Sequence, residues 1–280
     1  LAITPKARKK RYSKLSIDEL IELKVPLEQT VAYASKVKSR QKLRQFFSWV
    51  IEQAQISSDK LTKSLVLENP CDNIKIYKDR RQSKRTHFSK LDEKELFKRQ
   101  LYLKKSVEDG LPIIREDHHY WGGLIMRTTG VRPNELFQSQ LCNWDYDSSI
   151  NTWILWATDK GENQTIKTEG SIRPIVMPQI IMDKGFDAFI KNQKVNYSKS
   201  TRLFHKIKAT SSYYSPAFTT WFNNTLMKAT NIAKEDQVGR KKSAYSLRHT
   251  FITSARKDGA QFDVIKQNVG HSIKRTLDTT

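Results

Sequence analysis

Side chains suited to chemistry at a phosphate occur in four short segments, and the first is residues 129–136. This segment contains a glycine that suits a turn, and Pro133 then favours the first position of a helix. Arg132 is therefore expected at a helix N-terminus, where backbone N–H groups favour an anion, with Glu135 near enough to orient its guanidinium. Taken alone, the segment fits a helix cap with a surface ion pair equally well.

The second segment, residues 166–178, places Lys167 beside a turn that leads into an apolar strand expected over residues 172–177. A lysine at or near a hairpin tip can reach a phosphate or a leaving oxygen, as an acid or as a point charge. Lysines at hairpin tips are usually only solvated, so Lys167 indicates a site only together with the other segments.

The third segment, residues 243–253, has helical periodicity. We expect Leu247, Phe251 and Ile252 to form its apolar face, and Arg248 to point elsewhere.

The fourth segment, residues 265–272, predicts the end of another helix. We expect Val264, Ile265 and Val269 to pack inward and Gly270 to cap the helix, which leaves His271 free to project into a site. A single histidine in such a place is more often structural than functional.

An acid–histidine cluster at residues 116–119 has two interpretations, a metal site and the polar start of a helix. The cluster directly precedes an apolar stretch that begins near Trp121, which favours the helix start. We therefore expect neither a metal ion nor any other cofactor.

Helices around one small sheet are expected to position these segments. Capping-box patterns or helical periodicity occur at Ser16, over residues 30–55, at Ser89, over 119–129 and 134–141, and from about residue 216 to the end. Strand patterns occur over residues 152–157 and 172–177. The expected fold class is mainly α with a small antiparallel β-sheet, in the α+β class.

Basic residues concentrate in two regions that could lie along a DNA backbone. One is the helix expected over residues 30–55, and the other is the linker stretch 78–88. Residues 78–86 of that stretch have no apolar anchor, which is typical of a domain linker. The residues expected to contact DNA are Lys36, Lys38, Arg40, Lys42, Arg44, Arg80, Arg81, Lys84 and Arg85.

Composition agrees with a nucleic-acid partner. The 280 residues suit two domains, and 50 Lys and Arg against 29 Asp and Glu give a net charge of +21, which attracts polyanions. A merely soluble basic protein is the alternative.

The two cysteines make neither a disulfide framework nor a zinc site, and no apolar run is long enough for a membrane span. Because the chain begins with Leu and shows no signal peptide, we expect it to be trimmed at its front.

Together, the segments resemble those of the tyrosine recombinase family, and more closely phage-type integrases of the lambda-integrase kind. The resemblance covers about residues 30–280 and rests on Thr-Gly-Val-Arg-Pro-Asn-Glu-Leu, on Lys-Thr with Arg-Pro-Ile-Val-Met-Pro, on Tyr-Ser-Leu-Arg-His-Thr and on Val-Gly-His-Ser. It implies a helical core-binding domain over residues 1–77, a basic linker over 78–88 and a catalytic domain over 89–280.

The resemblance also implies roles for the residues that match. Arg132 and Arg248 would clamp the scissile phosphate, Lys167 would protonate the departing 5′ oxygen, His271 would hydrogen-bond the phosphate, and Glu135 would support Arg132. The implied partners are double-stranded DNA, a homo-tetramer assembled on DNA, and accessory DNA-bending or directionality factors, with no membrane. The implied location is the cytoplasm of a bacterial host cell, at the nucleoid.

Two departures from the family pattern stand out. Tyr245 occupies a position where the family often has histidine; its hydroxyl can donate to a phosphate, but general-base assistance there is not expected. No tyrosine follows Tyr245, although the family spacing puts the nucleophile shortly after His271. We expect the sequence to be cut before that tyrosine, so that this chain binds DNA without cleaving it. The alternative is a catalytically inactive DNA-binding protein derived from an integrase.

Overall fold

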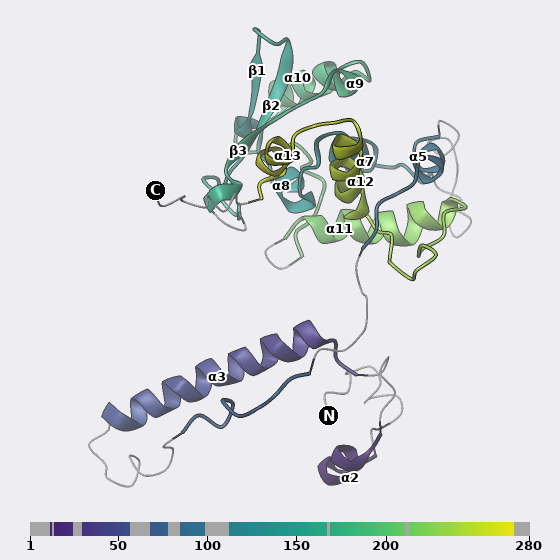
Figure 1. Cartoon of the computed structure of the whole chain (residues 1–280). Coiled ribbons are helices and arrows are strands. Elements are labelled where there is room, and N and C mark those ends of the chain that lie inside the picture. Colours follow the sequence, from purple (N-terminus) through teal and green to yellow (C-terminus); the bar gives the residue numbers. More distant parts are fainter. Residues whose placement is uncertain are drawn as a thin grey trace, which may run out of the picture. The chain divides into compact units, whose positions relative to one another are not determined.

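The computed structural model of the chain describes residues 12, 14–24, 30–56, 68–77, 85–98, 112–166, 169–210 and 213–271. The chain forms two compact units, residues 1–82 and 83–280 (Figure 1). The boundary falls within the stretch expected to be a linker, and residues 78–84 of that stretch lie outside the described residues.

The first unit contains two described helices, α2 (Ile17–Glu22) and α3 (Tyr33–Ile56). The capping box predicted at Ser16 starts α2: its hydroxyl accepts from the N–H of Glu19 at 3.2 Å, and its own N–H donates to the Glu19 carboxylate at 2.7 Å. The helix expected over residues 30–55 is present as α3, shifted by a few residues at its start.

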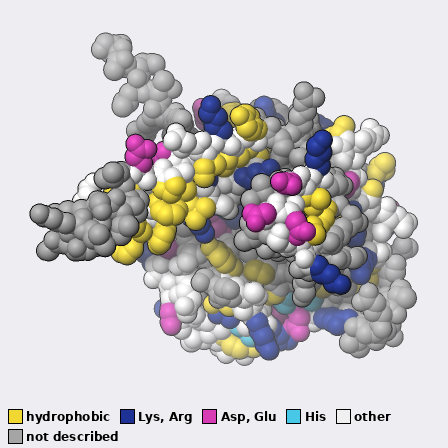
Figure 2. All heavy atoms as spheres, turned by 90° about the horizontal axis from the view of Figure 1, so that it is seen from below, with side chains coloured by type: hydrophobic (Ala, Val, Ile, Leu, Met, Phe, Trp, Pro, Cys, Tyr) yellow, Lys and Arg dark blue, Asp and Glu magenta, His cyan; other side chains and the backbone are white. Residues whose placement is uncertain are grey.

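The apolar side chains of α3 are largely exposed to solvent. Leu43, Phe46 and Trp49 are 50%, 54% and 56% exposed, and Ala54 is the buried residue of the helix. The view from below in Figure 2 shows hydrophobic side chains following this helix. The helical periodicity read from the sequence is therefore real, although it does not mark a buried core in the described part of this unit.

The second unit contains a three-stranded antiparallel sheet in the order β1 (Trp144–Asp147), β2 (Thr152–Ala157), β3 (Arg173–Val176). The register pairs Trp144 with Leu155 and Leu155 with Ile175, so three fully buried side chains lie side by side across the sheet. The strand predicted over residues 152–157 is confirmed at its bounds, and β3 lies within the predicted range. Strand β1 was not predicted, because four residues with two aspartates give no strand pattern.

The other regular elements described in this unit are helical, which confirms the mainly α fold with a small antiparallel sheet. They are α5 (Lys90–Leu96), α7 (Asp117–Thr129), α8 (Pro133–Phe137), α9 (Gln179–Met182), α10 (Phe186–Asn196), α11 (Ser215–Trp221), α12 (Ser246–Lys257) and α13 (Phe262–Val269). Short 3-10 turns lie at Leu141–Asn143, Glu169–Ser171 and Met227–Ala229, and a π-helical turn at Phe222–Leu226 follows α11. Helix α7 packs against α8, α11 and α12, and most of its side chains are buried.

Helix α8 is shorter than the helix predicted over residues 134–141 and ends at Phe137. The residues that follow pair with a distant segment: the N–H of Leu141 donates to the carbonyl of Thr201, and the N–H of Leu203 donates to the carbonyl of Ser139. This long-range pairing satisfies backbone groups that a longer helix would have used. The predicted helical run from residue 216 onwards is likewise interrupted, since residues 230–245 are not helical.

The inward face predicted for the last helix is partly wrong. In α13, Ile265 and Val269 are buried as expected, but Val264 is 55% exposed. Ile265 and Val269 are four residues apart and share one face, whereas Val264 points about 100° away from Ile265. Gly270 ends the helix in a left-handed conformation (φ 65°), as predicted.

Candidate functional site

Arg132 lies at the turn between α7 and α8 and directly precedes the helix that Pro133 begins. Gly130 makes the turn possible, with φ 68° and its N–H donating to the carbonyl of Met126. Glu135 holds Arg132 twice, since its carboxylate accepts from the Arg132 N–H at 3.1 Å and from Nη1 at 2.6 Å. The predicted support of Arg132 by Glu135 is thus present as geometry.

Arg248 is one of the most buried side chains of the second unit, with 1% of its surface exposed. It extends from the first turn of α12, where Nη1 donates to the carbonyl of Gly130 and Nη2 donates to the carbonyl of Val269 at 2.6 Å. The guanidinium therefore joins the α7–α8 turn to the end of α13.

His271 is exposed and follows the Gly270 cap of α13. Its Nε2 lies 3.2 Å from Nη2 of Arg248, and its N–H donates to the carbonyl of Lys266 at 2.9 Å. On the other side of the same turn, Nη2 of Arg132 donates to the carbonyl of Gly270 at 2.7 Å. The turn at the end of α13 thus brings Arg132, Arg248 and His271 together.

Charges of like sign gather at this place. Burial lowers the pKa of Arg248 to about 10; the nearby guanidiniums of Arg132 and Arg173 act in the same direction, against Tyr245 and Glu135, which raise it. At that pKa Arg248 is still charged at neutral pH. Several positive charges with few counter-charges form a site that gains free energy by taking up an anion.

Tyr245 immediately precedes α12 and is half-buried. The guanidinium carbon of Arg85 lies 5.0 Å from the centre of its ring, and the edge of the ring meets His249 with the ring centres 5.5 Å apart. The cation–π contact connects a basic residue predicted for the linker to the site.

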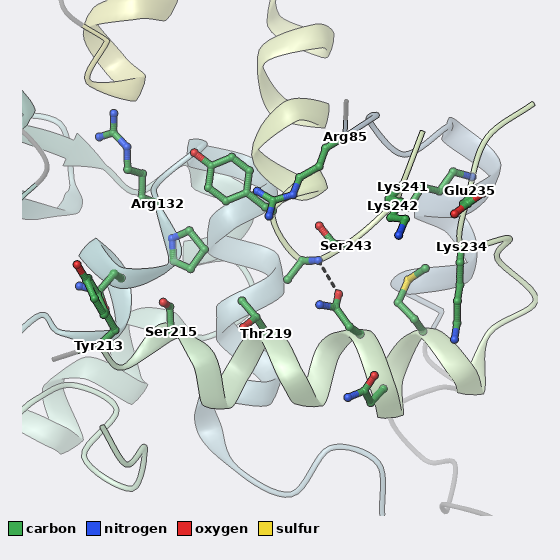
Figure 3. A pocket seen from close by; sticks show the side chains of 17 residues that line it. Arg85, Arg132, Tyr213, Ser215, Thr219, Lys234, Glu235, Lys241, Lys242 and Ser243 are labelled. Atoms are coloured by element: carbon green, nitrogen blue, oxygen red, sulfur yellow. Dashed lines mark hydrogen bonds between the residues drawn. The ribbon is translucent and has the colours of Figure 1, made fainter. Parts of the chain in front are cut away.

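A cavity of about 700 Å³ opens beside these residues (Figure 3). Ser215 and Thr219 line it from α11, with Arg132 and Arg85 on the opposite side and Tyr213 at one end; Lys234, Glu235, Lys241 and Lys242 lie at the other end. Five basic residues line the cavity against one acidic residue, so its walls favour a negatively charged occupant. Of these five, Lys234, Lys241 and Lys242 had not been singled out from the sequence.

Several predicted site residues cannot be placed. Lys167, Arg80, Arg81 and Lys84 lie outside the described residues.

The basic residues of α3 divide into two kinds. Arg40 donates from Nε and Nη2 to the carbonyls of Cys71 and Asp72 at 3.0 Å each, and Arg44 pairs with the Asp72 carboxylate at 2.5 Å. Lys38 and Lys42 are exposed, and Lys36 is half-buried. Two of the five predicted DNA contacts therefore also hold the segment after α3 in place.

The acid–histidine cluster at residues 116–119 forms the start of α7. The His119 ring stacks on Trp221 with ring centres 4.0 Å apart, and its Nδ1 accepts from the N–H of Arg115 at 3.3 Å. Burial lowers the pKa of His118 to about 4 and that of His119 to about 3. Within the described ranges, no three His, Cys, Asp or Glu side chains group as a metal site would require.

None of the described helices combines the length and the apolarity needed to cross a bilayer.

Arg173 is a site residue that sequence reasoning missed. It begins β3, is 7% exposed, and donates to both oxygens of Glu135 at 3.2 and 2.9 Å. A signal was present: in the β3 alternation, Arg173 shares the buried face with Ile175, and a charged residue on a buried face needs a partner.

Comparison with known proteins relates this chain to solved structures alone, since no family model and no curated protein matches it. The Tn1549 transposon integrase, solved with a circular intermediate DNA, is similar with a TM-score of 0.57 and 18% identity over 88% of this chain and 74% of that chain. The XerH site-specific recombinase, bound to its difH substrate before cleavage, is similar with a TM-score of 0.55 and 18% identity over 87% of this chain and 60% of that chain. The chain therefore has the fold of the tyrosine recombinases.

Proposed function

We propose that this protein is a site-specific DNA recombinase of the tyrosine type, which binds duplex attachment-site DNA and exchanges strands through a 3′-phosphotyrosyl intermediate. The observation that carries the proposal is the meeting of Arg132, Arg248 and His271 at one turn, with Arg132 also lining a cavity whose charged residues are five basic and one acidic. The fold supports it, since the Tn1549 integrase and the XerH recombinase, both solved with DNA, have a similar fold.

In the proposed reaction, a tyrosine hydroxyl releases its proton to water as its oxygen attacks the scissile phosphorus, and a new P–O bond forms while the P–O5′ bond breaks. Charge grows on the non-bridging oxygens as the transition state forms, and the forked donors of Arg132 and Arg248 suit those oxygens. His271 donates a further hydrogen bond to them. Lys167 supplies the proton that the departing 5′ oxygen takes up. The step needs no metal ion, because the guanidiniums supply the positive charge.

Tyr245 and the cavity would bind the DNA around that phosphate. The hydroxyl of Tyr245 donates to the phosphate, and Arg85, Lys234 and Lys241 neutralise neighbouring phosphates along the cavity. The net charge of +21 favours association with such a polyanion. The basic residues of α3 and of the stretch before Arg85 extend the contact, and a tetramer on DNA performs the exchange.

A second function is favoured by one observation. Cleavage requires a tyrosine hydroxyl, and the sequence from Ser246 to Thr280 contains none. If no tyrosine follows Thr280 in the encoded protein, the protein would be a DNA-binding regulator that keeps the integrase fold. Reading the encoding DNA beyond the codon for Thr280 separates the two functions, because a tyrosine codon close by favours the enzyme.

The binding part of the proposal is tested with a duplex selected by the protein from a random pool. We expect binding to weaken as salt rises, with a slope that becomes shallower by about 0.9 for each phosphate contact that is lost. Arg85→Gln and Lys241→Gln should each show that change. Lys184→Gln removes the same charge from an exposed residue that does not line the cavity, and should leave the slope unchanged. Equal slopes in all three variants would contradict the proposed DNA contacts.

The cleavage part is tested with a nicked suicide substrate built on the selected DNA sequence. The protein used is extended beyond Thr280 to include the next encoded tyrosine, if one follows. We expect a covalent adduct that Arg132→Ala and Arg248→Ala each abolish. An adduct that persists in either variant would refute the assigned roles. Sequence-specific binding without any adduct would establish the regulator instead.

A further inference from the structure

A buried ion-pair network lies behind the phosphate site, and the roles assigned above do not use all of it. Arg132 and Arg173 both donate to the carboxylate of Glu135. Oε1 accepts from Nη1 of Arg132 at 2.6 Å and from Nη1 of Arg173 at 3.2 Å, and Oε2 accepts from Nη2 of Arg173 at 2.9 Å. Only 4% of the Glu135 side chain and 7% of the Arg173 side chain are exposed, against 15% for Arg132. Arg173 therefore belongs to the interior, and Arg132 to the edge of the site.

Arg173 also holds the turn that carries His271. Its Nε donates to the carbonyl of Asn268 at 2.7 Å, and its Nη1 donates to the carbonyl of Ser171 at 2.9 Å. One guanidinium thus joins β3, α8 and the end of α13, which are far apart in the sequence. Any shift of Arg173 would therefore displace both the Glu135 carboxylate that holds Arg132 and the backbone just before His271.

Gly270 shows how closely the turn lies on the two guanidiniums. A Cβ at this position would lie 2.7 Å from Nη1 of Arg173 and 3.1 Å from Nη1 of Arg132, both too close for an unstrained contact. The backbone at residue 270 is therefore fitted against these two side chains.

The charges of the network favour the same role. One carboxylate between two guanidiniums leaves a net charge of +1, whereas Glu135 with Arg132 alone would be neutral. Burial by itself would raise the pKa of Glu135, but the hydrogen bonds and charge of Arg173, and then those of Arg132, outweigh burial and lower it. The carboxylate is therefore ionised at neutral pH, and Arg173 offsets its charge.

We propose that Arg173 is a positioning residue for the phosphate site: it offsets the charge of Glu135 and orients its carboxylate, so that the group keeps a net positive charge and Arg132 keeps its direction, and it fixes the turn that presents His271. The inference rests on the proposed function, since it assumes that Arg132 and His271 act on a DNA phosphate. Arg173 itself does not touch the phosphate.

The experiment measures the affinity for the selected duplex as a function of salt, together with the unfolding temperature of each variant. Arg173→Met should weaken binding and make the salt slope shallower by about 0.9 or more, because Glu135 then neutralises Arg132. Arg127→Met is the matched control, since Arg127 also forms a half-buried ion pair, with Glu93 at 2.7 Å, and joins α7 to α12 through Ser254 at 3.0 Å. It should lower the unfolding temperature and leave the slope unchanged.

A rescue separates electrostatic positioning from structural support. In the double variant Arg173→Met with Glu135→Gln, one positive and one negative charge are removed together, so we expect the salt slope to return towards the wild-type value. Arg173→Lys keeps the charge without the fork and should give an intermediate slope. These charge-balanced variants keep the test valid if Arg173→Met alone does not fold.

The outcomes are distinct. If Arg173→Met has the same slope as Arg127→Met, or if the double variant does not recover, the inference is overturned while the proposed function stands. If the wild-type chain shows no salt-dependent binding to duplex DNA, the proposed function itself has failed.

Discussion

Arg248 and His271 meet with Nη2 and Nε2 3.2 Å apart, although 23 positions separate them in the sequence. Their surroundings differ. Arg248 is 1% exposed and tied to the carbonyls of Gly130 and Val269, whereas His271 is exposed at the end of α13. Arg248 thus joins buried parts of the fold, whereas the side chain of His271 lies at the surface.

This difference predicts that substitutions of the two residues change the free energy of unfolding by different amounts. His271→Ala should change the free energy of unfolding by no more than about 0.5 kcal/mol, as is usual for an exposed side chain, yet weaken binding to the selected duplex. Arg248→Ala should destabilise the protein by about 2–4 kcal/mol, because two buried carbonyls lose their donor. Urea unfolding and fluorescence anisotropy measure the two effects. A His271→Ala variant as unstable as Arg248→Ala would show that His271 is structural.

A second prediction concerns the glycine that caps α13. Gly270→Ala places a methyl group against Arg173 and Arg132 and forces a left-handed backbone on alanine, so we expect both lower stability and weaker DNA binding. Gly259→Ala is the matched control, because Gly259 has φ 86° but nothing within 4 Å of the added Cβ. It should cost only the backbone term, about 1 kcal/mol, and leave DNA binding unchanged. Equal DNA affinities for the two variants would show that the close contacts of Gly270 do not matter for DNA binding.

The sequence predicts best those features whose physical cause lies in neighbouring residues. The capping boxes at Ser16 and Ser89 and the cap at Gly270 each depend on residues within one helical turn, and all three are present. Strand β2 was found for the same reason, since alternation and β-branching are local.

Features that depend on distant partners could not be predicted in this way. Arg173 pairs with Glu135, which lies 38 positions away, and with the carbonyl of Asn268, which lies 95 positions away. Similarly, the segment after α8 leaves the helix because its backbone pairs with residues 201–203. The local pattern places Arg173 on the buried face of its strand but does not identify its partners. The network that joins Arg132, Glu135 and Arg173 could therefore not be predicted from the sequence.

The start of α7 predicts a pH dependence of stability. Burial, with smaller contributions from His118 and Arg115, lowers the pKa of His119 from 6.5 to about 3. Between those values the unfolded chain binds a proton that the folded protein does not. The contribution of His119 to the free energy of unfolding is therefore fully present above pH 6.5 and is lost as the pH falls towards 3. One such histidine contributes a slope of at most about 1.4 kcal/mol per pH unit.

His119→Phe tests this contribution, because phenylalanine can keep the stack on Trp221 but cannot take up a proton. We expect its stability to fall less steeply than that of the wild type between pH 6.5 and 4, measured by urea unfolding at each pH. The comparison at pH 7.5, where the imidazole is neutral in both states, corrects for the lost hydrogen bond from the N–H of Arg115. Parallel curves for the two proteins would show that His119 titrates normally.

Two neighbouring glycines in α7 give a prediction about the core that supports the site. A Cβ on Gly122 would lie 2.7 Å from Cζ of Phe137 and 2.8 Å from Cε2 of Phe218, two fully buried rings, whereas a Cβ on Gly123 would meet Phe97 and Leu247 at ordinary distances of 3.8 and 4.0 Å. Gly122→Ala should therefore overpack the core and destabilise the protein by about 1–3 kcal/mol. Gly123→Ala should stabilise it by about 0.5–1 kcal/mol, because alanine loses less entropy than glycine in a helix. Thermal and urea unfolding of both variants give the sign directly, and two changes of the same sign would contradict the packing of α7 against α8 and α11.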